Sequence, residues 1–154
     1  MKLINSFKFA FRGVLSGIKN EMNFRIHTVA AVTVIIFSCI YGVDSAKAAL
    51  LTLTICLVMV AELINTAVEA MVDIISPEKT SFAKIAKDSS AGAVLVLAIG
   101  AVIIAFLTFS DMEKLKNVLF FIKENIAATI IYIVICILYV FFFKSIHKRK
   151  DMSK

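Results

Sequence analysis

Apolar side chains recur at helical spacing through residues 3–19, and polar side chains occupy most of the opposite face. This pattern predicts an amphipathic helix that lies in a membrane surface; a soluble helix packed on a partner is the alternative interpretation. Four longer apolar segments follow, and each is close to the roughly 20 residues that cross a bilayer core. These segments are residues 26–43, 48–72, 91–109 and 126–143. The pattern therefore predicts an all-α membrane protein with an N-terminal surface helix and four transmembrane helices.

The amino-acid composition agrees with a membrane location. Of the 154 residues, 60% are hydrophobic, and the mean hydropathy is +0.93, whereas soluble chains contain roughly 45–50% apolar residues. Cys39, Cys56 and Cys136 lie in apolar runs without CxxC spacing, so the sequence supports neither a disulfide framework nor a zinc site. The net charge of +6 comes from basic residues that flank the apolar segments. This placement favours anionic lipid headgroups over nucleic acid as the counter-charge.

The positions of the Lys and Arg residues predict the topology. Thirteen of the 17 lie before the first span, between the second and third spans, or after the fourth span. The positive-inside rule then places both termini and the loop of residues 76–88 in the cytoplasm.

The second span contains a polar stripe within the segment AELINTAVEAMVD. Glu62, Asn65, Glu69 and Asp73 are spaced by three, four and four residues, so all four lie on one face of a helix. Only residues 48–61 of this span are uncharged, so a helix long enough to cross carries Glu62 to the acyl–headgroup boundary. An acidic face therefore runs from lipid depth towards the cytoplasm.

Such a stripe is energetically unfavourable, because a carboxylate at bilayer depth costs about 2.5–3.5 kcal/mol of insertion free energy. One interpretation is that Glu62 and Asn65 only join helices through hydrogen bonds. Other polar residues expected at the same membrane level favour a functional role: Glu21, Asn23, Arg25, Glu78, Lys84, Lys87 and Asp88. Carboxylates from two helix ends can hold Mg²⁺, and nearby lysines balance phosphate charge. Their coincidence indicates phosphoryl transfer from a nucleotide to a lipid hydroxyl.

Four segments carry a resemblance to a known family. NEMNFRIH, AELINTAVEAMVD, SPE and AKIAKDSSAGAVL resemble the signature of the small prokaryotic integral-membrane kinases that phosphorylate diacylglycerol or undecaprenol. The resemblance covers about residues 1–110, the expected lipid kinase domain, and leaves residues 111–154 as an extension with a fourth span and a basic tail. Ser76-Pro-Glu and His27 resemble the undecaprenol kinase branch, which favours undecaprenol over diacylglycerol as acceptor. The product would be undecaprenyl phosphate or phosphatidic acid, respectively.

The resemblance implies a role for each matching residue. Glu21 and Glu69 would hold the Mg²⁺ that bridges the ATP phosphates, Glu62 would accept the proton of the lipid hydroxyl, and Asn65 would orient the reacting groups. The remaining nucleotide contacts would be Asp73, Glu78, Lys87 and Asp88. The resemblance also implies a homotrimer in the bacterial cell membrane, with active sites shared between subunits.

The residues alone rank these roles less firmly. Glu62 is the deepest carboxylate, and desolvation suits it to proton transfer, whereas Glu69 is nearer water and better placed to meet Mg·ATP. Glu69 as the base remains an alternative. The segment GVLSGIKN departs from P-loop spacing and lies on the surface helix, so we exclude a P-loop.

Two other functions fit part of the pattern. A small proton- or cation-coupled transport subunit would use Glu62 and Glu69 as a relay, but the outer half of every span lacks ionisable residues. A structural scaffold explains the spans but not the acidic stripe. The chain departs from the family pattern at Phe9, where some members carry an aromatic hydroxyl, and in its fourth span, which we expect to be peripheral and to face lipid.

Overall fold

The computed structural model describes residues 2–78 and 80–151, and these residues form six helices and no strand. The helices are α1 (Lys2–Asn20), α2 (Met22–Tyr41), α3 (Ser45–Ile75), α4 (Ser81–Thr108), α5 (Met112–Glu124) and α6 (Ile126–Asp151). The predicted all-α class and the predicted N-terminal amphipathic helix are confirmed. The basic tail expected at the C-terminal end lies outside the residues whose side chains the structure describes.

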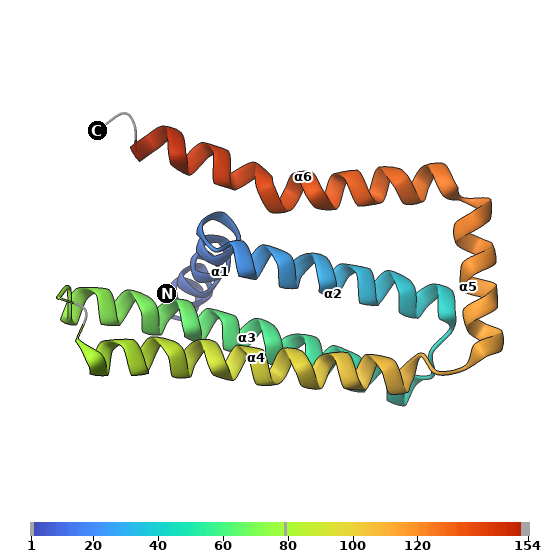
Figure 1. Cartoon of the computed structure of the whole chain (residues 1–154), viewed down its shortest axis with the longest axis horizontal. Coiled ribbons are helices and arrows are strands. Elements are labelled where there is room, and N and C mark those ends of the chain that lie inside the picture. Colours follow the sequence, from blue (N-terminus) through green and yellow to red (C-terminus); the bar gives the residue numbers. More distant parts are fainter. Residues whose placement is uncertain (1, 79, 152–154) are drawn as a thin grey trace.

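Four long helices run beside one another, and two shorter helices join or brace them (Figure 1). α3 and α4 form an antiparallel pair with the most extensive contact in the fold, and α2 packs on α3. α6 packs along the side of α2 that faces away from the α3–α4 pair. α1 contacts α2, α3 and α6 near the start of α2. The layers therefore follow the order α4 and α3, then α2, then α6.

Among the described residues, three helices are long and apolar enough to cross a membrane: Met22–Tyr41, Ser45–Ile75 and Ser81–Thr108. A fourth crossing is reached only when α5 and α6 are counted as one pair, and these two helices are bent by 89°. The segment between the third and fourth predicted spans was expected only as a connection. It forms a helix instead, and it stands across the ends of α2 and α4 (Figure 1).

Side-chain caps extend two spans beyond their apolar cores. Asp44 accepts a hydrogen bond from the backbone N–H of Lys47 at 2.9 Å, so α3 begins before its apolar run. The hydroxyl of Thr80 accepts from the backbone N–H of Ala83 at 3.3 Å and starts α4 at Ser81. The predicted loop of residues 76–88 is therefore wrong in its second half. No Gly or Pro follows the cap to stop a helix there, so the charged residues of this segment continue the helix as its first turns.

Few apolar side chains are buried inside a single copy of the chain. The buried apolar side chains among the described residues are Phe24, Tyr41, Leu51, Val58, Ala83, Val94 and Val118. Most large apolar side chains of α3, α4 and α6 face outwards, which is the pattern expected where lipid tails or neighbouring subunits cover the helices. The structure thus has an apolar exterior and a small interior. Among the described residues, two of the buried polar side chains, Glu62 and Asn65, lie one turn apart on α3, whereas the buried Thr108 lies at the far end of α4.

Candidate active site

The polar stripe on α3 becomes more exposed along the helix. Glu62 and Asn65 are 2% and 6% exposed, respectively, Glu69 is half-buried, and the Asp73 side chain is 69% exposed. The 31-residue helix is uninterrupted, so the spacing read from the sequence does place these groups on one face. The stripe therefore leads from the protein interior to the end of the α3–α4 pair.

Asn65 connects this stripe to α4. Its side-chain Nδ2 donates to Oε1 of Glu69 at 3.0 Å, and its Oδ1 accepts from the Ser90 hydroxyl at 2.6 Å. Because one amide atom donates and the other accepts, the two bonds together set the orientation of the amide. Ser90 was missed by the sequence reading, although it lies one turn after Lys87 in the motif KDSS. The side chain that orients Glu69 is thus itself held from a second helix.

A third carboxylate reaches the same region from the junction of α1 and α2. The charges of Glu21 and Glu69 both act on Glu62. Within the described part of the chain, no side chain donates a hydrogen bond to the Glu62 carboxylate. α1 approaches this region closely, because a Cβ on Gly17 would lie 3.2 Å from Cδ2 of Leu63. The fold therefore gathers Glu21, Glu62 and Glu69 within one chain.

A polar cavity of about 250 Å³ lies where α3 ends and α4 begins. Its polar lining comes from Asp73, Ser76, Lys84, Lys87 and Asp88. The Lys87 ammonium group forms an ion pair with the Asp73 carboxylate across the two helices. Three of the four residues predicted to contact a nucleotide therefore line one cavity.

Glu78, the fourth of these predicted residues, does not line this cavity. It is exposed in the turn between α3 and α4. A long phosphate-bearing ligand would have to extend past the cavity to reach it.

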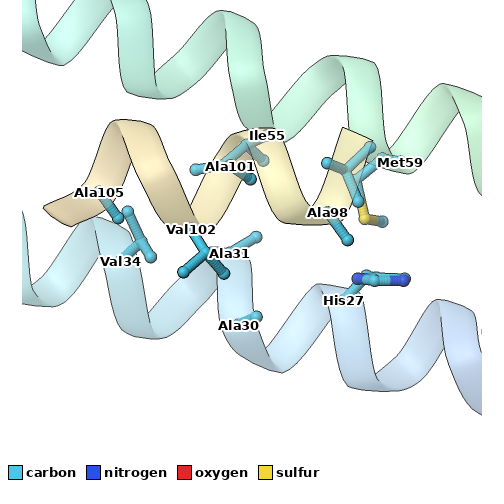
Figure 2. A pocket seen from close by; sticks show the side chains of 11 residues that line it. His27, Ala30, Ala31, Val34, Ile55, Met59, Ala98, Ala101, Val102 and Ala105 are labelled. Atoms are coloured by element: carbon cyan, nitrogen blue, oxygen red, sulfur yellow. The ribbon is translucent and has the colours of Figure 1, made fainter. Parts of the chain in front are cut away.

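An apolar groove of about 280 Å³ lies between α2, α3 and α4 (Figure 2). His27 and Met59 lie at one end of the groove, and Val34 and Ala105 lie at the other. Met59 precedes Glu62 by three residues on α3, so the polar stripe continues from the His27 end. Small side chains keep the groove open: Ala30, Ala31, Ala98, Ala101 and Ala105. The groove is therefore suited to a hydrocarbon chain whose polar end lies near Glu62.

The donor set limits what metal this region can hold. Among the described residues, no three His, Cys, Asp or Glu side chains are arranged to hold one ion together. Mg²⁺ does not need such a cage, because it is usually bound by one or two carboxylates together with substrate phosphates. Two carboxylates would therefore suffice, and Glu21 and Glu69 are both near enough to Glu62 for their charges to interact with it.

Apolar spans, an apolar groove and an adjoining site of carboxylates and lysines fit the class of integral-membrane lipid kinases. Residues 8–109 match the family model of the prokaryotic diacylglycerol kinases. The chain belongs to this family.

Similar proteins carry two different names. The chain is 46% identical over 103 residues to a diacylglycerol kinase of Synechocystis sp.; the match covers 66% of this chain and 59% of that protein. It is 36% identical over 108 residues to an undecaprenol kinase of Bacillus subtilis; this match covers 70% of this chain and 88% of that protein. A diacylglycerol kinase of Escherichia coli K12 is 34% identical over 102 residues, with 66% and 84% covered.

Proposed function

We propose that this protein transfers the γ-phosphate of ATP to the hydroxyl of a membrane lipid. The observation that carries the proposal is the pair of hydrogen bonds by which Asn65 joins Glu69 on α3 to Ser90 on α4. These bonds lie between a cavity with two lysines and a groove that suits a hydrocarbon chain. Each neighbour matches one substrate, because lysines attract phosphates and an apolar groove accepts a lipid tail.

In the proposed reaction, the oxygen of the lipid hydroxyl forms a bond to the γ-phosphorus of ATP. The bond from that phosphorus to the bridging oxygen of the β-phosphate breaks, and ADP leaves. Glu62 takes the proton of the hydroxyl, because it is the most buried carboxylate of the stripe and lies one helical turn after Met59, which lines the groove. Asn65 keeps Glu69 in one orientation while the phosphate moves.

Glu21 and Glu69 are the proposed ligands for Mg²⁺. When bound, Mg²⁺ would neutralise negative charge on the transferring phosphate. Lys87, Asp73 and Asp88 would contact the nucleotide from the cavity, and Glu78 would contact it from the neighbouring turn. In the free protein, the Lys87–Asp73 ion pair keeps the lysine beside the cavity until phosphate replaces the carboxylate as its partner.

Replacing Glu69 tests the proposed chemistry directly. Glu69→Gln keeps the shape of the side chain but removes the charge, so we expect turnover to be lost while the protein still inserts into membranes. The assay is transfer of radiolabelled γ-phosphate from ATP to lipid in mixed micelles with Mg²⁺. Near-normal transfer by this variant would refute the assignment of Glu69.

The acceptor we favour is undecaprenol, on the basis of Ser76-Pro-Glu and His27, with diacylglycerol as the alternative. The names of the relatives include both lipids. Both acceptors present a primary hydroxyl attached to apolar chains, so the same groove can serve either. Offering the two lipids separately decides between them, because label on diacylglycerol alone would reverse the preference while leaving the reaction intact.

A homotrimer with shared active sites is also part of the proposal. The small interior of the single chain leaves wide apolar helix faces for subunit contact. Co-assembly of Glu21→Gln chains with Glu69→Gln chains distinguishes the arrangements. Recovery of activity in the mixed assemblies indicates that the two carboxylates act across subunits. No recovery indicates that they act within one chain.

The proposed location is the bacterial cell membrane, with both termini and the active site on the cytoplasmic side. Residues 1–110 would form the kinase domain and residues 111–154 an extension. Labelling of single-cysteine variants by a membrane-impermeant maleimide in intact cells tests the topology. A cysteine at Ser76 should be protected in intact cells, and one at Lys116 should react.

A further inference from the structure

A buried arginine joins the C-terminal helix to the corner that carries Glu21. Arg25 is 3% exposed. Its Nε donates to the carbonyl oxygen of Val140 on α6 at 3.0 Å. Its Nη1 donates to the carbonyl oxygens of Ile18 and Lys19 at 3.1 Å and 3.2 Å. One guanidinium group therefore contacts α1 and α6 while its backbone lies in α2.

The contacts on α1 stabilise the end of that helix. Ile18 and Lys19 lie in the last turn of α1, where carbonyl groups have no partner within the helix. A cation at this position satisfies those carbonyls and interacts favourably with the helix dipole. Lysine cannot replace the guanidinium group, because its single nitrogen cannot point at α1 and α6 in the same rigid geometry.

The junction between α1 and α2 is short and has no capping hydrogen bond of its own, so the bonds of Arg25 hold the two helices together. α1 ends at Asn20 and α2 begins at Met22, so Glu21 alone connects them. Its backbone is extended, with φ −104° and ψ 117°, and its side chain forms no capping hydrogen bond. The direction in which Glu21 projects is therefore set by how α1 and α2 are held relative to each other.

α6 reaches this junction without touching the rest of the site. In the described part of the chain, α6 packs on α1, α2 and α5 but makes no contact with α3 or α4. A second hydrogen bond holds it to α2, between the hydroxyls of Thr33 and Tyr132 at 2.7 Å. α6 can therefore influence the polar stripe only through α1, α2 and α5, and the bonds of Arg25 place one of these contacts at the α1–α2 junction.

We infer that α6 is a positioning element for catalysis, and that it acts through Arg25 to hold Glu21 beside Glu62 and Glu69. This inference rests on the proposed lipid kinase function. It assigns to the extension a role that lies outside residues 8–109, the segment matched by the family model. α6 lies at the edge of the bundle with most of its apolar side chains exposed, as a peripheral helix would, and its backbone is in addition bonded to Arg25.

The first test compares Arg25→Lys with Arg12→Lys in the full-length protein. Arg12 is an exposed arginine of α1 and serves as the matched control. In Arg25→Lys, we expect the Mg²⁺ concentration for half-maximal activity to rise about three- to tenfold. That effect is smaller than the roughly 10- to 100-fold loss seen when a direct partner of a metal ligand is removed. The KM for lipid should stay unchanged, because neither Arg25 nor Glu21 lines the groove.

The second test needs neither nucleotide nor metal. Hydrogen–deuterium exchange of the full-length protein in nanodiscs should become faster in two separate segments of Arg25→Lys, around residues 17–25 and around residues 136–144. Tyr132→Phe removes the hydrogen bond between α6 and Thr33 of α2, and it should raise exchange in residues 17–25 as well. Tyr139→Phe is its control, because within the described residues no hydrogen bond involves the Tyr139 hydroxyl.

The outcomes separate the inference from the proposed function. A shifted Mg²⁺ dependence together with faster exchange in both segments supports the inference. A lower kcat with unchanged Mg²⁺ dependence and uniformly faster exchange would show a purely structural role and overturn it. Unchanged exchange in residues 17–25 of Tyr132→Phe would overturn it as well. A third outcome is faster exchange in both segments of Arg25→Lys together with a wild-type protein that phosphorylates neither lipid. That outcome would overturn the proposed function while supporting the link from α6 to the α1–α2 junction.

Discussion

The Ser90 hydroxyl should contribute to catalysis only through Asn65. In the structure, Ser90 donates to Oδ1 of Asn65, and the amide nitrogen then faces Glu69. Removing the hydroxyl lets the amide turn over, which would present an oxygen to the Glu69 carboxylate. Removing the amide altogether deprives Glu69 of its donor. The two substitutions therefore act on the same link in the network.

Their magnitudes follow from the kinds of hydrogen bond lost. Ser90→Ala removes a neutral hydrogen bond worth about 0.5–1.5 kcal/mol, which corresponds to a decrease in kcat of about 2- to 13-fold. Asn65→Ala removes a hydrogen bond to a charged group worth about 1.5–3 kcal/mol, or about 13- to 160-fold. If Ser90 acts through Asn65, the double variant should be no slower than Asn65→Ala alone.

The assay is initial-rate phosphate transfer to lipid in mixed micelles, with the amount of folded protein measured by size-exclusion chromatography. Ser89→Ala is the matched control, since Ser89 is the exposed neighbour of Ser90 on α4 and should retain full activity. A double variant whose loss equals the product of the two single losses would show that Ser90 acts independently. That result would refute the orientation argument.

Two further predictions concern stability. Gly17→Ala should destabilise the protein by about 1–3 kcal/mol, because the new methyl group meets Leu63 at 3.2 Å and overpacks the contact of α1 with α3. Gly13→Ala, which meets nothing within 4 Å, should be neutral or stabilising in the same thermal unfolding assay. The N–H of Lys47 donates to Asp44 and lowers the pKa of that carboxyl. The cap therefore stabilises α3 fully above the unfolded-state pKa, and its contribution is lost as the pH falls through the lower folded-state pKa. Asp44→Asn should reduce the loss of thermal stability below about pH 4; equal losses in both proteins would contradict this.

The sequence was sufficient to predict the stripe on α3, because four polar residues at helical spacing lie within one uninterrupted helix. Periodicity describes one helix at a time, so it could not identify the side chains that reach the stripe from elsewhere. Ser90 is 25 residues from Asn65, and only the packing of α4 on α3 brings them together.

The boundaries of the helices were less predictable than their existence. Apolar runs mark the part of a helix that lies in lipid, whereas caps such as Thr80 decide where the helix starts. Lys84 and Lys87 therefore appeared to be loop residues although they belong to the first turns of α4. This difference changes the picture of the cavity, because a helix holds both lysines in a fixed register opposite Asp73.

Arg25 shows that a few hydrogen bonds between residues far apart in the sequence can fix how the helices of this protein pack. In lipid, apolar side chains gain little by leaving hydrocarbon for a protein interface, so close packing and a few polar bonds hold helices together. The guanidinium group of Arg25 makes such bonds across 115 residues of sequence, to a carbonyl oxygen that no side-chain pattern can reveal. Substitutions on the lipid-facing side of α6 should therefore be tolerated, whereas changes that shift its backbone near Val140 should disturb Glu21.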